Sequence, residues 1–286
     1  MKPKGSWRAG HETIGPLRMY YRDWRPAGGG KAPAVVALHG SLVQSGMWIP
    51  VAEGVGKARF ICPDQRGYGL SSDPGSGDSA ADFARDAIGL ANALMLDRFT
   101  VMGHSFAYAI ALEAARMEPE RVAAAVLVDP TVRDASGHQQ NLGRAAERPA
   151  SFPSFAETLR WWRENEEGGW PAAEVKRFLR EVMVAEGNGG PCRAPYTQER
   201  LLRLRAFQAS PGSDYGIGAA KHVKCPVLIF RGSLSRRLSA QAERRLRNAL
   251  PNGAQSVLCR KSGHFPSVSE PKRFNDALRK FLAGTR

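Results

Sequence analysis

Short apolar runs rich in β-branched residues alternate along this chain with longer stretches that are apolar on one side and charged on the other. The short runs, which are the expected strands, are residues 34–38, 60–62, 99–102, 122–128, 227–230 and 256–259. The longer stretches, which are the expected helices, are residues 80–96, 105–117, 240–249 and 271–282. Such alternation predicts an α/β fold with a mostly parallel, twisted sheet and helices on both faces. Residues 7–24 predict an antiparallel hairpin in front of it.

The alternation stops between Thr131 and about Gly216. This segment contains the tryptophans Trp161, Trp162 and Trp170, and it has a Gly- and Pro-rich break at 187–195. Its charged helical stretches include residues 172–185 and 198–207. We interpret residues 131–216 as a helical lid inserted after the sixth strand, and residues 1–130 and 217–286 as one core.

The pentapeptide Gly103-His104-Ser105-Phe106-Ala107 stands between an expected strand and an expected helix. A serine in a sharp strand-to-helix turn, with small residues on either side, is the pattern of a nucleophile elbow. Ala107 replaces the commoner glycine and makes the approach of helix and strand tighter. Ser105 is therefore the candidate nucleophile, and His104 inside the same turn is expected to point away from its hydroxyl.

Acyl transfer by a serine also needs a base and donors for the developing oxyanion. His264 follows the last expected strand, where a loop can place its imidazole above the same sheet edge as Ser105. Strand 34–38 ends at the same edge, so the backbone amide of Ser41 is one candidate oxyanion donor, with Leu42 as the competing choice. The amide of Phe106 is the second donor.

Four motifs occur in one order: Leu38-His39-Gly40-Ser41, the loop from Asp64 to Ser71, the elbow, and Ser262-Gly263-His264-Phe265. With them the chain resembles proteins of the α/β-hydrolase fold, in particular the lid-bearing esterase and epoxide-hydrolase-like group, over about residues 15 to 284. The resemblance implies that Asp64 and Arg66 are structural. It implies no metal and no organic cofactor. It disfavours epoxide opening and halide displacement, because those relatives have an aspartate where Ser105 stands.

The resemblance fails at the acid of the triad, which is expected after strand 227–230, near Ser235 or Arg236. Some relatives take the acid from the end of the preceding strand, and here Asp129 follows strand 122–128. Asp129 is thus the candidate that orients His264, and Asp134 is the next carboxylate to consider. A degraded triad is the remaining alternative.

Arg236 and Arg237 occupy the vacated acid position. Guanidinium groups near the catalytic rim can hold a substrate carboxylate in a bidentate pair. The alternative is that both face solvent at the entrance of a helix. Trp161 and Trp162 of the expected lid are further candidates for contact with the substrate.

The 286 residues carry a formal net charge of +14 and a sequence pI of about 10.1. The positive residues are spread singly along helices, without a block of like charges, so we expect a solvated basic surface and neither a nucleic acid nor a membrane partner. Steering of anionic substrates is the functional alternative. The four cysteines are scattered and no secretory signal is recognisable, which favours a cytoplasmic protein.

The sequence therefore predicts a serine hydrolase that cleaves an acyl bond of a small-molecule substrate through Ser105, His264 and Asp129. A carboxylic ester or a lactone is the expected substrate, and the sequence allows a homo-oligomer. One alternative is a cofactor-free carbon–carbon hydrolase or lyase on the same fold. The other is a non-catalytic ligand-binding protein with a degraded triad.

Overall fold

The computed structural model describes residues 5–28, 32–165, 170, 172–185 and 190–285. Its core is an eight-stranded sheet in the order β1-β2-β4-β3-β5-β6-β10-β11. The strands are β1 (Gly5–Ile14), β2 (Leu17–Pro26), β3 (Ala34–Leu38), β4 (Arg59–Pro63), β5 (Phe99–His104), β6 (Val122–Val128), β10 (Val227–Gly232) and β11 (Gln255–Cys259). Strand β2 runs against its neighbours β1 and β4, and the other neighbouring pairs are parallel. The predicted hairpin and mostly parallel sheet are confirmed.

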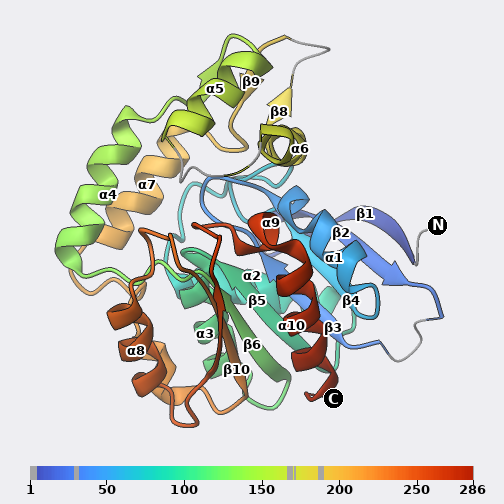
Figure 1. The fold of residues 1–286 in the computed structure, drawn as a ribbon. Coiled ribbons are helices and arrows are strands. Elements are labelled where there is room, and N and C mark those ends of the chain that lie inside the picture. Colours follow the sequence, from blue (N-terminus) through green and yellow to red (C-terminus); the bar gives the residue numbers. More distant parts are fainter. Residues whose placement is uncertain (1–4, 29–31, 166–169, 171, 186–189, 286) are drawn as a thin grey trace.

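Helices cover both faces of this sheet (Figure 1). Helix α1 packs against α10, and α2 packs against α3, which in turn contacts β5 and β6. The core helices are α1 (Ile49–Val55), α2 (Ala80–Ala93), α3 (Ala107–Met117), α8 (Ala240–Ala249), α9 (Pro266–Ser269) and α10 (Pro271–Ala283), with 3-10 turns at Ser45–Trp48 and Gly218–His222. Every residue of β5 is buried, as expected for a central parallel strand with helices on both sides.

Helix α2 begins where the sequence predicts, because Ser79 and Asp82 form a reciprocal capping box. It ends earlier than predicted, at Ala93, and Met95 just beyond it has a φ of 52°. Helix α1 was not predicted. Its seven residues contain a proline and a glycine and are too few for a clear amphipathic period.

Residues 131–216 leave the core after β6, and their described part forms four helices and a small sheet. These elements are α4 (Ala135–Glu147), β7 (Ser151–Phe152), α5 (Phe155–Asn165), α6 (Ala172–Val182), β8 (Val184–Ala185), β9 (Cys192–Arg193) and α7 (Gln198–Ala209). Figure 1 shows the helices gathered beyond one end of the core sheet. The predicted helix 172–185 is too long, because Val184 and Ala185 pair with β9 instead. Residues 187–189 of the predicted break lie outside the described residues.

Charged hydrogen bonds fasten this insertion to the loop that follows β4. Arg200 of α7 pairs with Asp78, and Arg203 reaches Asp78 at 2.9 Å and Asp73 at 2.5 Å. The amide of Gly69 donates to the carbonyl of Pro195 at 2.7 Å. The insertion is therefore held over the end of the sheet at several points, and the contact between Arg200 and Asp78 is buried.

No helix in the described part of the chain is both long and apolar enough to cross a membrane. The four cysteines are free thiols, and three of them, Cys62, Cys192 and Cys259, are buried. They pack as small apolar side chains.

Candidate active site

Ser105 lies in the sharp turn between β5 and α3, with a φ of 59°. This left-handed conformation is strained for a residue with a side chain, and here the amide of Ser105 is held by the carbonyl of Val128 at 3.0 Å. Gly103 allows the turn, because a Cβ atom at that position would collide with the backbone of Ala107. Ala107 itself fits, fully buried, at the start of α3. The local geometry is that of an elbow which projects one hydroxyl from the sheet edge.

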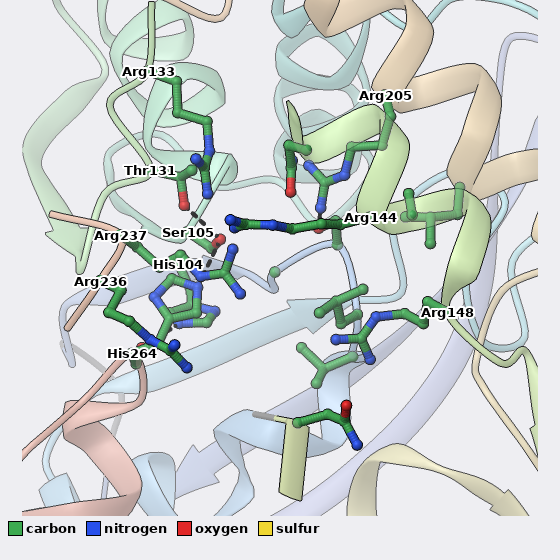
Figure 2. A pocket seen from close by; sticks show the side chains of 18 of the residues that line it. His104, Ser105, Thr131, Arg133, Arg144, Arg148, Arg205, Arg236, Arg237 and His264 are labelled. Atoms are coloured by element: carbon green, nitrogen blue, oxygen red, sulfur yellow. Dashed lines mark hydrogen bonds between the residues drawn. The ribbon is translucent and has the colours of Figure 1, made fainter. Parts of the chain in front are cut away.

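A chain of hydrogen bonds runs from Ser105 through His264 to Asp129 (Figure 2 shows the Ser105 and His264 end). The Oγ atom of Ser105 is 2.9 Å from Nε2 of His264, and Nδ1 of His264 is 2.7 Å from Oδ2 of Asp129. All three side chains are buried. The three residues come from the ends of β5, β6 and the loop after β11, and they meet because parallel strands end at the same edge of the sheet.

Asp129 is held by the loop where the acid of the resembled proteins was expected. The amide of Gly232 donates to Oδ1 at 2.9 Å, and the hydroxyl of Ser235 donates to Oδ2 at 2.5 Å. Ser235 thus supports a carboxylate that comes from the neighbouring strand. The competing Asp134 is exposed and caps α4 by accepting from the amide of Gly137 at 2.8 Å. The structure brings Asp129, and not Asp134, to His264.

The protonation states follow from burial and neighbouring charge. Burial lowers the pKa of His264 well below its usual value, and the positive charges of Arg237, Arg133 and Arg205 lower it further. Burial raises the pKa of Asp129 to about 6, while its hydrogen bonds from Ser235 and Gly232 oppose the rise. At neutral pH Asp129 is a carboxylate and His264 is a neutral imidazole. With Nδ1–H donated to Asp129, the free lone pair of Nε2 faces Ser105.

The loop after β3 passes directly beside the elbow. A Cβ atom at Gly40 would lie 2.6 Å from Nδ1 of His104 and 3.3 Å from Cβ of Ser105, so only glycine fits there without displacement. His39 braces the loop, since its Nε2 accepts from the amide of Gln65 at 3.0 Å and its Nδ1 donates to the carbonyl of Gly40 at 2.8 Å. Burial also lowers the pKa of His39, which keeps it neutral.

The amides of Ser41, Leu42 and Phe106 donate to no oxygen in the hydrogen bonds of the described chain. They are therefore available to an oxygen of a bound molecule. The assignment of Ser41 and Phe106 as donors, and the choice of Ser41 over Leu42, stay predictions.

Two further side chains, those of His104 and Thr131, lie next to Ser105. His104 directs Nε2 to the carbonyl of His264 at 2.8 Å, and burial, the largest cause, lowers its pKa to about 3. Thr131, which the sequence reasoning missed, places its Oγ1 2.9 Å from Oγ of Ser105. Its position two residues beyond Asp129, at the same strand end, was the signal that could have found it.

Asp64 and Arg66 make the structural contacts expected of them. The carboxylate of Asp64 accepts from the amides of Ser45 and Leu70 at 2.9 Å each, which holds two loops together. Arg66 forms a bidentate pair with Asp86 at 2.6 and 2.7 Å. Neither side chain lines the cavity at Ser105.

A cavity of about 690 Å³ opens at Ser105 between the core and the insertion. Its described lining is rich in positive charge and contains one acidic residue, Glu147. Figure 2 shows the arginine side chains around Ser105 and His264. These arginines are Arg133, Arg144, Arg148, Arg205, Arg236 and Arg237.

Arg236 and Arg237 thus reach the cavity, as one of the two sequence interpretations held. The other four arginines come from the insertion and were not predicted, because their sequence does not show which face of a helix will meet the core.

Of the two predicted tryptophans, Trp161 lines the cavity, with the guanidinium of Arg148 4.6 Å from its ring centre. Trp162 does not line it. Its ring is buried against Phe178 and Phe265, at centroid distances of 5.8 and 6.2 Å. On helix α5 the two neighbouring positions face different directions, so the expectation for Trp162 is corrected to a packing role.

A family model described as the alpha/beta hydrolase family matches residues 35–277. The chain belongs to this family. As a member of this family it is an enzyme, a hydrolase that acts on a small-molecule substrate. The match is to the family as a whole and does not identify the lid-bearing esterase and epoxide-hydrolase-like group that the sequence resembles.

Several relatives extend the comparison. A Mycobacterium tuberculosis protein of uncharacterized function is 26% identical over 286 residues, covering 93% of this chain and 79% of the relative. An Escherichia coli protein named as a candidate carbamate hydrolase, RutD, is 26% identical over 259 residues, covering 88% and 92%. The crystal structure of E-2-(acetamidomethylene)succinate hydrolase superposes with a TM-score of 0.83 at 22% identity, covering 97% of this chain and 100% of that one. This likeness shows the same fold.

Proposed function

We propose that this hydrolase is a serine hydrolase that cleaves an acyl bond through an acyl-enzyme intermediate. The observation that carries the proposal is the unbroken hydrogen-bonded series of Ser105, His264 and Asp129, with a neutral imidazole facing the hydroxyl. A hydroxyl, a base and a group that orients the base are the parts that nucleophilic catalysis requires. A carboxylic ester or a lactone is the proposed substrate.

In the first half of the reaction, Oγ of Ser105 forms a bond to the acyl carbon while its proton passes to Nε2 of His264. The carbonyl electrons move to the oxygen, where the amides of Phe106 and of Ser41 stabilise the negative charge. Asp129 stabilises the imidazolium through Nδ1. When the tetrahedral intermediate collapses, the bond to the leaving oxygen breaks and His264 returns the proton to it.

In the second half, a water molecule replaces the alcohol. His264 takes a proton from water, the hydroxide oxygen bonds to the acyl carbon, and the same amides hold the oxyanion. Collapse breaks the bond to Oγ of Ser105, which regains its proton from His264. The acid leaves and the enzyme is restored.

The insertion of residues 131–216 is proposed to act as a lid, because its side chains form one wall of the cavity at Ser105. Substrates with a carboxylate are favoured, since Arg236 and Arg237 on the core side also line that cavity. A guanidinium is suited to bidentate recognition of a carboxylate. We place the enzyme in the cytoplasm as part of the same proposal.

Hydrolysis of p-nitrophenyl acetate tests the proposal. The wild-type enzyme should release p-nitrophenol, and Ser105→Ala should lower kcat/KM by about a thousandfold or more. Ser210, an exposed serine at the end of α7, provides the control, and Ser210→Ala should leave the rate unchanged. A Ser105→Ala enzyme that keeps more than about a tenth of the rate would contradict the proposal.

A substrate panel separates the rival functions. Esters matched with carbamates and amides of the same acyl group test whether the bond cleaved is to oxygen or nitrogen, which the name of the Escherichia coli relative makes relevant. Turnover of a diketone without ester cleavage would favour the carbon–carbon hydrolase. A folded protein inactive on all of these would contradict the proposed cleavage of an acyl bond.

A further inference from the structure

Helix α7 contains two buried arginines with different surroundings. Arg200 is almost completely buried and is balanced by the carboxylate of Asp78. Arg205, five residues later, is also buried, with 7% of its surface exposed. No ion pair of the described residues includes Arg205. The helix thus carries one buried cation with a counter-charge and another that has none among the described residues.

The partners of Arg205 in the described part of the chain are all neutral. Its Nη1 donates to Oε1 of Gln208 at 2.7 Å, and its Nη2 donates to Oγ of Ser41. With the amide of Asn141 turned so that its oxygen faces the guanidinium, this oxygen accepts from Nε and Nη1 at 3.1 Å each. These contacts fix the direction of the guanidinium but do not neutralise it. A buried charge that is hydrogen-bonded but not balanced is costly to keep unless a ligand supplies the opposite charge.

The charged groups around Arg205 also favour a bound anion. Burial lowers its pKa to about 10, and repulsion from Arg237, Arg133 and Arg148 contributes, against the opposing influence of Tyr68. Arg205 therefore remains a cation at neutral pH, in a cavity wall where other cations already repel it. An anion bound there would relieve both the burial cost and the repulsion.

The sheet places Arg205 and the pair Arg236–Arg237 on opposite sides of the nucleophile. Arg205 binds Ser41, which follows β3, whereas Arg236 and Arg237 follow β10. Ser105 follows β5 directly, and the strand order β3-β5-β6-β10 puts it between them. Figure 2 shows Arg205 on one side of Ser105 and Arg236 and Arg237 on the other. A molecule that reacts at Ser105 can thus reach positive charge at both of its ends.

We propose that Arg205 forms a second anion subsite and that the substrate is a dianion, such as the ester of an acid that bears two further carboxylates. One carboxylate binds Arg205 on the insertion side of the cavity, and the other binds Arg236 and Arg237 on the core side. The bond to be cleaved then lies between them, over Ser105. This proposal rests on the proposed function for the chemistry at Ser105, but the binding of the dianion stands independently of it.

Calorimetry of ligand binding tests the subsite without turnover. The proteins carry Ser105→Ala, and the ligands are glutarate with two carboxylates, butyrate with one, and dimethyl glutarate with none. Without further change, glutarate should bind roughly tenfold more tightly than butyrate, and dimethyl glutarate should bind most weakly. Arg205→Gln should reduce the preference for glutarate to about one, and Arg205→Lys should retain part of it because the charge remains.

Arg203→Gln is the matched control, since it removes the same charge from the same helix outside the cavity lining. It should keep the preference for glutarate. Circular dichroism establishes whether each variant is folded. If Arg205→Gln does not fold, the comparison rests on Arg205→Lys. An unchanged preference in Arg205→Lys and Arg205→Gln would overturn the proposal. So would equal binding of glutarate and butyrate before Arg205 is changed.

The two proposals fail in different ways. Preferential binding of glutarate with no ester cleavage in the wild type would leave the subsite standing and refute the serine hydrolase. Ester cleavage that depends on Ser105, with no preference for glutarate, would do the reverse.

Discussion

Replacement of Asp129 with asparagine exchanges one carboxylate oxygen for an amide nitrogen, and the hydrogen-bond donors around Asp129 determine the effect on activity. The Oδ1 atom of Asp129 accepts from the amide of Gly232, and Oδ2 accepts from Ser235 and from Nδ1 of His264. Asparagine has nearly the same shape, so the fold is expected to persist. One of the two oxygens, however, becomes an amide nitrogen that donates hydrogen bonds.

Each orientation of the new amide is unfavourable for the reaction. If its oxygen stays on Gly232, its NH₂ group faces His264 and donates to Nδ1. The imidazole proton then sits on Nε2, which can no longer accept the proton of Ser105. If the amide turns over, its NH₂ group meets the N–H of Gly232, and two buried donors are left without an acceptor.

The magnitude follows from these contacts. A buried donor without a partner costs about 1–3 kcal/mol, and a lost hydrogen bond to a charged group costs about 1.5–3 kcal/mol. Together they raise the barrier by about 2.5–6 kcal/mol, which corresponds to a loss of roughly 10² to 10⁴ in kcat. A triad whose orienting carboxylate becomes an amide is expected to lose activity on this scale.

Steady-state hydrolysis of p-nitrophenyl acetate by wild type, Asp129→Asn and Asp134→Asn measures the effect. Asp134→Asn is the control, because this exposed residue only caps α4 and asparagine caps equally well. Its rate should equal that of the wild type. A loss of less than about tenfold in Asp129→Asn would refute the role of Asp129, and a large loss in Asp134→Asn would transfer that role to Asp134.

Three further predictions address the surroundings of the site. Arg237→Gln removes a positive charge that lowers the pKa of His264. The acid limb of the pH profile of kcat/KM should therefore move to higher pH, by up to about one pH unit. A shift to lower pH would contradict this effect of Arg237 on His264. Gly40→Ala should lower kcat/KM by about tenfold or more, because the added methyl group collides with His104. Gly143→Ala is the control and should not lower it, because the space around Gly143 is open. Equal rates in the two variants would mean that the close packing at Gly40 does not matter. Asp86→Asn removes the ion-pair partner of the buried Arg66 and should reduce the free energy of unfolding in urea by about 3–5 kcal/mol. A loss below about 1 kcal/mol would mean that the pair is not structural.

The sequence predicted those parts of the fold that depend on local patterns. Strands 34–38 and 122–128 and helix 240–249 have the predicted bounds, because their apolar periodicity ends abruptly at polar or turn-forming residues. Helix 172–185 was predicted too long, since Val184 and Ala185 suit a helix locally but pair with β9. Such pairing depends on residues remote in the sequence and overrides local preference.

The residues of the candidate site also differ in whether the sequence could predict them. Ser105, His264 and Asp129 could be predicted because each follows a parallel strand, and parallel strands end at one edge. Arg205 could not, because its position in the cavity depends on how the insertion docks on the core. The same holds for Trp162, whose neighbour Trp161 reaches the cavity although the two residues are adjacent in sequence.

Covalent labelling shows whether Ser105 is an activated nucleophile, as the proposed mechanism requires. Wild-type protein is treated with a fluorophosphonate at neutral pH, and the modified peptide is identified by mass spectrometry. We expect one adduct per chain, on Ser105, with none on Ser105→Ala and strongly slowed labelling of Asp129→Asn. Folded wild-type protein that remains unlabelled, or a label that persists in Ser105→Ala, would contradict the proposed mechanism.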